Sequence, residues 1–116
     1  LNHVTSIDFS DNDISALNRS QFKNLNNLKI LLLTLNKINY IEQGAFDGLM
    51  SLEFLFINLN SLKNIDNYVF TGMPALLGLD LTRNQIEIVD RDAFQNLENL
   101  ADLDLSYNKI QILNPD

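Results

Sequence analysis

Asparagine recurs at intervals of 24 residues along this chain, at Asn12, Asn36, Asn60, Asn84 and Asn108. Around each Asn the sequence follows one pattern, LxxLxLxxNxIxxIxxxxFxxLxx, with no insertion or deletion between units. A repeat this strict predicts a solenoid, because a single unit cannot bury its own apolar side chains and must stack on its neighbours. In a solenoid we expect function to lie on an extended surface rather than in a buried catalytic pocket.

Apolar residues occupy the same columns in every unit. The three columns before the Asn hold Val4, Leu28, Leu52, Leu76 and Leu100, then Ile7, Leu31, Leu55, Leu79 and Leu103, then Phe9, Leu33, Ile57, Leu81 and Leu105. The two columns after it hold Ile14, Ile38, Leu62, Ile86 and Ile110, then Leu17, Ile41, Ile65, Val89 and Leu113. The first four units close with Phe22, Phe46, Phe70 and Phe94, each followed three residues later by Leu25, Leu49, Met73 or Leu97. At these residues the chain resembles the leucine-rich repeat family over essentially its whole length.

The resemblance implies an α/β-class solenoid that is mostly β and irregular. Such a solenoid is a right-handed superhelix with a parallel concave sheet and one short strand per unit. The alternation of apolar residues around Leu31 and Leu33 independently predicts a short strand in each unit. Apolar positions are too sparse in the return leg for an amphipathic helix, so we expect loops and short 3₁₀ turns on the convex side.

The Asn and Phe columns have structural roles in this interpretation. An Asn side chain carries two donors and one acceptor oxygen, enough to satisfy backbone groups left unpaired where a strand turns away. We therefore expect the five Asn to form a ladder through the array rather than to contact a ligand. The four Phe are expected to form a spine that fills the core on the side opposite the strands.

The sequence predicts one continuous array over residues 1–116, with units starting near residues 4, 28, 52, 76 and 100. The last unit is incomplete, and neither end has the polar cap that solenoids need. Capping segments of secreted relatives are rich in Cys, whereas this chain has none. We expect an internal fragment of a longer ectodomain, and the alternative is a naturally short protein with open ends.

Units of this length with a Phe spine resemble those of extracellular proteins, such as Toll-like receptor ectodomains, insect immune proteins and adhesion receptors. The resemblance implies a secreted protein or a membrane-protein ectodomain. Asn18 begins an Asn-Arg-Ser glycosylation triplet in a return-leg loop, although an Asn-rich chain contains such a triplet by chance. The net charge of −7 and the absence of an apolar run of roughly 18 residues argue against nucleic-acid binding and membrane insertion.

No catalytic or metal-binding constellation is apparent. His3 is the only His and has no Cys or second His with which to share a metal. The pairs Asp11/Asp13 and Asp90/Asp92 lie in different units and lack the dense oxygen spacing of a calcium loop. We expect no cofactor and no enzymatic activity.

The outward positions of the predicted strands differ between units. Units one, four and five carry Asp followed by Ser or Thr, whereas units two and three carry six large apolar residues: Ile30, Leu32, Leu35, Phe54, Phe56 and Leu59. These six, the apolar patch, are expected to expose roughly 300–600 Å², a size at which surface patches are often functional. The expected polar rim consists of Asp8, Asp80, Arg83 and Tyr107. The alternative is that these residue types simply favour strands.

The sequence therefore predicts a non-catalytic recognition module that binds a protein or an apolar ligand through its concave face. A second hypothesis is homophilic assembly or adhesion, with dimers formed through the concave faces or the open ends. A third is that the repeats are only a structural spacer.

Overall fold

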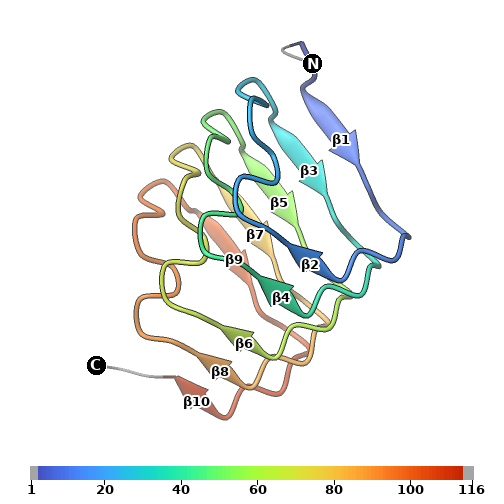
Figure 1. Ribbon diagram of the computed structural model, residues 1–116. Coiled ribbons are helices and arrows are strands. Elements are labelled where there is room, and N and C mark those ends of the chain that lie inside the picture. Colours follow the sequence, from blue (N-terminus) through green and yellow to red (C-terminus); the bar gives the residue numbers. More distant parts are fainter. Residues whose placement is uncertain (1–2, 114–116) are drawn as a thin grey trace.

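The computed structural model describes residues 3–113, which form a solenoid of short parallel strands joined by turns (Figure 1). One strand per unit enters a five-stranded sheet: β1 (Ser6–Asp8), β3 (Ile30–Leu32), β5 (Phe54–Phe56), β7 (Gly78–Asp80) and β9 (Asp102–Asp104). The strands lie in this order and are all parallel. Each residue pairs with the residue 24 positions later, as Ile30 does with Phe54. The predicted solenoid with its parallel sheet is confirmed.

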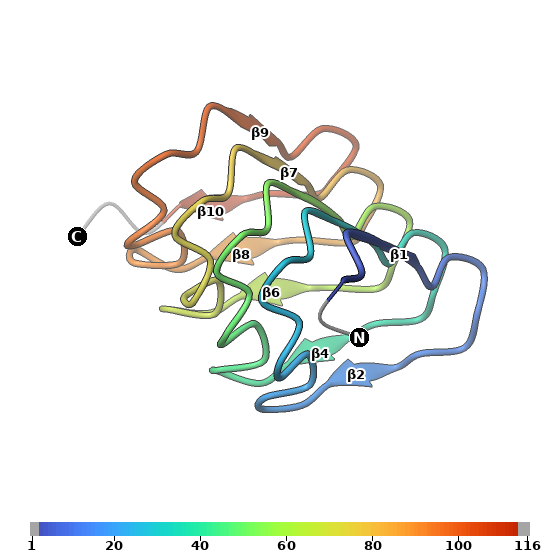
Figure 2. The ribbon, with the colours of Figure 1, turned by 90° about the horizontal axis from the view of Figure 1, so that it is seen from above.

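A second strand of two residues follows in every unit, and the sequence did not predict it. These strands are β2 (Ala16–Leu17), β4 (Tyr40–Ile41), β6 (Asn64–Ile65), β8 (Ile88–Val89) and β10 (Ile112–Leu113). They form a two-stranded ladder, β2-β4, and a three-stranded ladder, β6-β8-β10. Figure 2 shows them on the other side of the core from the five-stranded sheet. Equivalent segments of stacked units lie side by side in register, which lets even very short segments pair.

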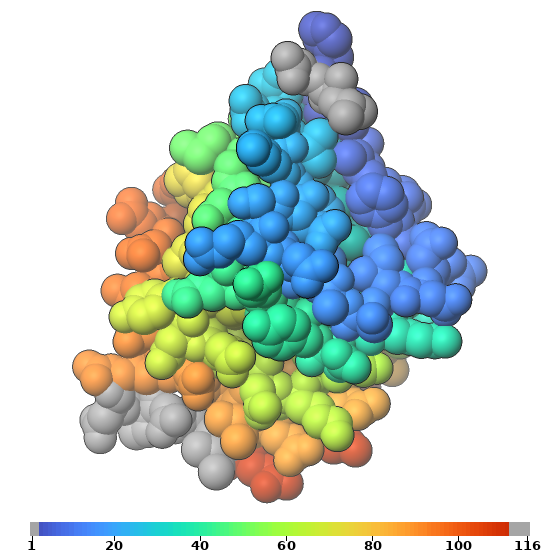
Figure 3. Space-filling view, viewed as in Figure 1, coloured from blue at the N-terminus to red at the C-terminus, as the bar shows by residue number. Residues whose placement is uncertain are grey.

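The predicted short 3₁₀ turns occur on the convex side as single turns. Single turns with the corresponding hydrogen bond occur, as where the N–H of Lys23 donates to the carbonyl of Ser20 at 3.2 Å. No run of them makes a 3₁₀ helix within residues 3–113. Successive units appear as adjacent bands of colour on the molecular surface (Figure 3).

The core contains the apolar columns of the inner units, in which Leu31, Leu55 and Phe46 are completely buried. The four Phe rings stack in sequence, with centroids 6.1, 5.8 and 5.8 Å apart. Strands in a sheet lie about 4.8 Å apart. Because the units are further apart at the Phe rings, the array curves with the five-stranded sheet on its inner, concave side.

The Asn side chains connect successive units by hydrogen bonds. Asn60 Nδ2 donates to the carbonyl of Leu33 in the preceding unit at 2.9 Å and to that of Ile57 in its own unit at 3.1 Å. Its Oδ1 accepts the N–H of Ile38 at 3.0 Å. Asn36, Asn84 and Asn108 repeat this pattern. Within residues 3–113, Asn12 bonds only to carbonyls of its own unit.

Candidate functional site

The outward side chains of β3 and β5 lie next to one another on the concave face. The register places Ile30 beside Phe54 and Leu32 beside Phe56. Phe54 is 36% exposed, and Ile30, Leu32 and Phe56 are half-buried. Just beyond the strands, Leu35 is 51% exposed and Leu59 is 38% exposed. The six predicted residues of the apolar patch are thus adjacent and open to solvent.

The polar outward residues of the other units have a local structural role. In units one, four and five an Asp carboxylate accepts the backbone N–H two residues later: Ser10 to Asp8 at 2.8 Å, Thr82 to Asp80 at 2.9 Å and Ser106 to Asp104 at 2.9 Å. This bond stabilises the turn at the end of the strand. Leu32 and Phe56 occupy the Asp position in units two and three. These two units therefore carry an apolar side chain in place of a turn-stabilising one.

Hydrogen bonding also affects two carboxylates of the concave face, Asp8 and Asp104. Ser10 lowers the pKa of Asp8, first through its side chain and then through its backbone N–H. Ser106 lowers the pKa of Asp104 in the same way. Both carboxylates therefore stay ionised to a lower pH than an isolated Asp.

The next outward column has left-handed backbone in every unit. The φ angles are 58° at Asp11, 57° at Leu35, 57° at Leu59, 57° at Arg83 and 59° at Tyr107. Apart from Gly, Asn and Asp tolerate this conformation best, and Leu tolerates it poorly. Leu35 and Leu59 therefore combine an unfavourable backbone conformation with an exposed apolar side chain.

A hollow lies beside the two Phe of the patch. Gly78 lines it and leaves room for the Phe54 ring, since a Cβ on this residue would lie only 2.9 Å from Cδ1 of Phe54. The hollow has a volume of about 170 Å³ and is bordered by Phe54, Phe56 and three carboxylates, Asp80, Asp102 and Asp104. The rim predicted from the sequence includes only Asp80 of these three carboxylates. The signal in the sequence was Gly78 itself, the only Gly in its column.

The rest of the predicted rim lies on both sides of the patch. Asp8 pairs in register with Leu32 on the side of β1. On the other side, the Arg83 guanidinium lies 4.1 Å from the centre of the Tyr107 ring. Tyr107 is 71% exposed, so this cation–π pair stands at the surface.

Other polar residues singled out in the sequence show no common site. Within residues 3–113, no group of three or more His, Cys, Asp or Glu side chains is placed to hold a metal ion. Asp13 makes an exposed ion pair with Lys37 at 3.1 Å, and Asp92 accepts a hydrogen bond from Tyr68 at 3.3 Å. Asn18 is exposed directly after β2. The described part of the chain has no helix of a length and apolar character to cross a membrane.

Comparison with known proteins agrees with the geometry. A family model described as leucine rich repeat matches residues 2–62 and, in a second overlapping match, residues 55–110. The two matches together span nearly the whole chain. No curated protein matches this chain.

Proposed function

The chain belongs to the leucine-rich repeat family, whose repeats typically serve as non-catalytic protein-interaction modules, and from this premise we propose that it binds a protein partner through its concave face. The contact centres on the apolar patch. Phe54 and Phe56 are the expected anchors, with Leu32 and Leu59 beside them, because large apolar side chains at the centre of an interface contribute most of the binding energy.

One observation supports this site above all others. Leu32 and Phe56 stand where three other units carry an Asp that stabilises its own turn. Random strand preference does not explain why the substitution is confined to two adjacent units. The result is an apolar centre with a polar rim, which is the usual anatomy of a protein interface.

The charges near the apolar patch indicate which side chains the partner presents. Three carboxylates border the hollow beside Phe54 and Phe56. A Lys or Arg side chain fits this combination, because its aliphatic stem can pack on the rings while its charged end meets the carboxylates. The proposed partner therefore presents a large apolar side chain next to a basic one.

Selection from a displayed peptide library tests the proposal. Peptides selected on the wild-type protein are expected to be enriched in a large apolar residue near Lys or Arg. Phe56→Glu should reduce their affinity at least tenfold, because it places a charge at the apolar centre. Met50→Glu is the control, since Met50 is 57% exposed and lies outside the patch. Equal binding to the wild type and to Phe56→Glu would refute the assignment.

We also propose that the module acts outside the cell, in a secreted protein or a receptor ectodomain with a role in innate immunity or adhesion. The supporting observations are the 24-residue unit with its Phe spine and the exposed glycosylation triplet at Asn18. When the protein is secreted from animal cells, we expect its mass to fall on treatment with a glycosidase. The Asn18→Gln variant should lack the glycan and show no such change in mass. A secreted protein without a glycan at Asn18 would remove the support that this triplet gives to an extracellular location.

Homophilic assembly is the second candidate. In addition to the concave patch, Phe9 and Leu103, in the first and last strand-bearing units, are each 39% exposed and offer apolar surface for stacking of copies. If the repeats were instead only a spacer, polar substitution of the entire apolar patch would leave all binding intact.

A further inference from the structure

The second ladder of the solenoid is interrupted between β4 and β6. On one side of the break, the N–H of Asn39 donates to the carbonyl of Ser15 at 3.0 Å, and the N–H of Glu42 donates to that of Leu17 at 2.8 Å. On the other side, unit four makes the same two bonds to unit three, from Glu87 to Lys63 at 2.8 Å and from Asp90 to Ile65 at 2.9 Å. The repeat therefore predicts two equivalent bonds from unit three to unit two.

Those two bonds are missing among residues 3–113. The donors would be the N–H groups of Lys63 and Asp66, and the acceptors would be the carbonyls of Asn39 and Ile41. Two edges thus face each other, one with free carbonyl groups and one with free N–H groups. Edges of this kind are templates for pairing with another chain.

Units two and three remain in contact on both sides of the break, so they are separated only locally. On one side, the N–H of Ser61 donates to the carbonyl of Ile38 at 2.9 Å. On the other side, Gly72 packs so closely on the preceding unit that a Cβ there would lie 2.8 Å from Cα of Asp47. Units two and three are therefore in contact before and after the break, so the gap between β4 and β6 has an end on each side.

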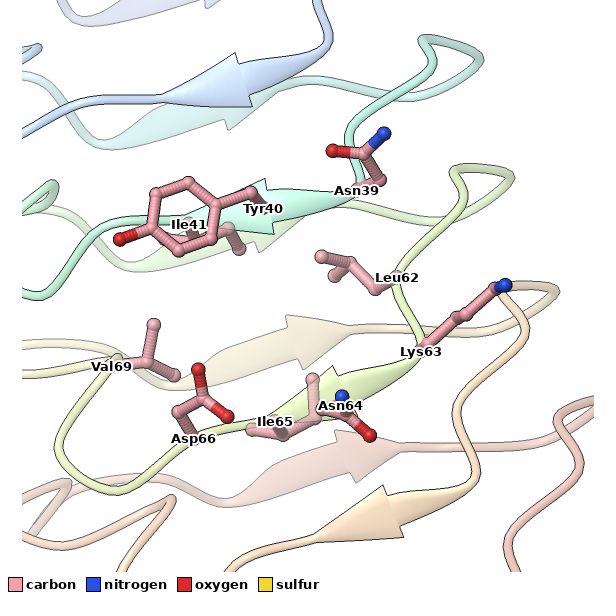
Figure 4. A pocket seen from close by; sticks show the side chains of 9 residues that line it. All are labelled: Asn39, Tyr40, Ile41, Leu62, Lys63, Asn64, Ile65, Asp66 and Val69. Carbon is pink, nitrogen blue, oxygen red and sulfur yellow. The ribbon is translucent and has the colours of Figure 1, made fainter.

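A cleft of about 360 Å³ occupies this opening (Figure 4). Its floor is apolar, formed in part by the buried side chains of Ile41, Ile65 and Val69. Figure 4 shows Tyr40 on the β4 side, and Asp66 with Val69 on the β6 side. The volume lies in the range of roughly 300–1,000 Å³ that is typical of ligand sites.

We propose that an extended peptide segment of a partner protein enters this cleft and pairs with both β4 and β6. Such a segment has N–H groups for the carbonyls of Asn39 and Ile41, and carbonyls for the N–H groups of Lys63 and Asp66. Its alternate side chains face the apolar floor, so the segment carries small or medium apolar residues at every second position. The site is separate from the apolar patch, because it lies across the core from the five-stranded sheet.

Amide hydrogen exchange, measured by NMR on the intact chain, tests the proposal. In the free protein, the amides of Lys63 and Asp66 are expected to exchange much faster than the equivalent bonded amides of Glu87 and Asp90. The probe is the blocked peptide acetyl-Thr-Val-Thr-Val-Thr-amide, chosen for its extended conformation and alternating apolar residues. Saturable binding in the millimolar range should slow exchange at Lys63 and Asp66 and leave Glu87 and Asp90 unchanged.

Matched controls distinguish binding by backbone hydrogen bonds from nonspecific apolar binding of the peptide. The same peptide with N-methylated valines cannot donate from those positions and should not protect either amide. Tyr40→Ala is expected to weaken binding about fivefold, since an aromatic neighbour stabilises an adjacent strand. Ile88→Ala, in the same column on the paired strand β8, should leave the affinity unchanged, as should Phe56→Glu on the concave face.

Three results would overturn the proposal. They are slow exchange of Lys63 and Asp66 in the free protein, no binding of the probe at millimolar concentration, and equal binding of the N-methylated peptide. Protection of both amides that grows with protein concentration alone would identify a second copy of this chain as the occupant, which also rejects a partner segment.

Discussion

At the scale of single residues, the side chains that recur in every unit stabilise the array, and the side chains that deviate from the repeat form the proposed binding site. Each inner Asn of the ladder satisfies backbone groups of two successive units, and Asn36, Asn60 and Asn84 are 6–7% exposed. A buried backbone group that loses its partner costs about 1–3 kcal/mol. The Asn column is therefore a structural requirement, whereas the outward columns are free to vary with function.

Replacing Asn60 by Ala should lower the free energy of unfolding by about 3 kcal/mol, because it leaves the N–H of Ile38 and the carbonyl of Ile57 without this partner. Urea unfolding followed by circular dichroism measures the change. Asn12→Ala is the matched control and should cost less than about 1 kcal/mol, since Asn12 is exposed and bonds only within its own unit. Similar losses in both variants would contradict a ladder between units.

Leu59 shows how a proposed binding residue can have an unfavourable backbone conformation. Its φ of 57° favours Asn, whereas its partly buried side chain favours Leu. Removal of the left-handed strain gains about 1 kcal/mol, and loss of the partial burial costs a similar amount. Leu59→Asn should therefore change stability by less than about 1 kcal/mol and still weaken binding of peptides selected on the wild type.

Leu59→Ala provides the comparison, because it loses the buried surface and keeps the strained backbone. It should be less stable than Leu59→Asn in the same urea experiment. If the Leu59→Ala variant were as stable as Leu59→Asn or more stable, the left-handed backbone at this column would not affect the free energy of unfolding.

At the scale of secondary-structure elements, prediction from the sequence succeeded where a period was strict. The alternation around Leu31 located β3 and, by the 24-residue repeat, every other strand of the five-stranded sheet. The two-residue strands were missed because their pairing depends on the neighbouring unit and not on a local pattern. For the same reason, no unit by itself reveals that β4 and β6 are unpaired.

The candidate site was predictable to the same extent. Outward positions and their apolar residues follow from the repeat, so the sequence predicts the placement of all six patch residues on the concave face, whereas their role in binding stays a prediction. The hollow beside Phe54 was not, because it depends on a residue of the next strand, Gly78, and on the direction in which the Phe54 ring turns. A contact across strands between unlike residues leaves no periodic signal.

Gly78→Ala tests how strand β7 positions the aromatic side chain of β5. The added Cβ would lie 2.9 Å from Cδ1 and 3.2 Å from Cε1 of Phe54, so the ring has to move while the backbone stays in place. We expect an unchanged fold and an affinity for the selected peptides that falls about tenfold.

Ser6→Ala is the control for Gly78→Ala, since Ser6 occupies the same column on β1 beside Ile30. It should affect neither fold nor affinity. Full affinity of Gly78→Ala, with chemical shifts that confirm a displaced ring, would exclude the hollow from the binding site.

At the scale of the whole molecule, the two proposed binding surfaces lie on opposite sides of one array. The concave face presents apolar anchors with a mostly acidic rim, and the opposite side presents a cleft bordered by free backbone groups. The first surface is suited to recognition of side chains, whereas the second is suited to pairing with an extended backbone. A single partner that binds both would have to pass around the edge of the array, whereas two partners could bind independently.

The net charge of −7 bears on the choice between a foreign partner and a second copy. Two concave faces in a symmetric dimer would bring like rims together, so that Asp80 and Asp104 of each copy approach carboxylates of the other. Repulsion of this kind is strong at low ionic strength and is screened by salt. We therefore expect sedimentation equilibrium to show a monomer at low salt over a wide range of protein concentration, and a basic partner to bind most tightly under those conditions. A dimer at low salt that Phe56→Glu dissociates would instead favour homophilic assembly through the apolar patch, whereas a dimer insensitive to Phe56→Glu would place self-association at the ends of the array.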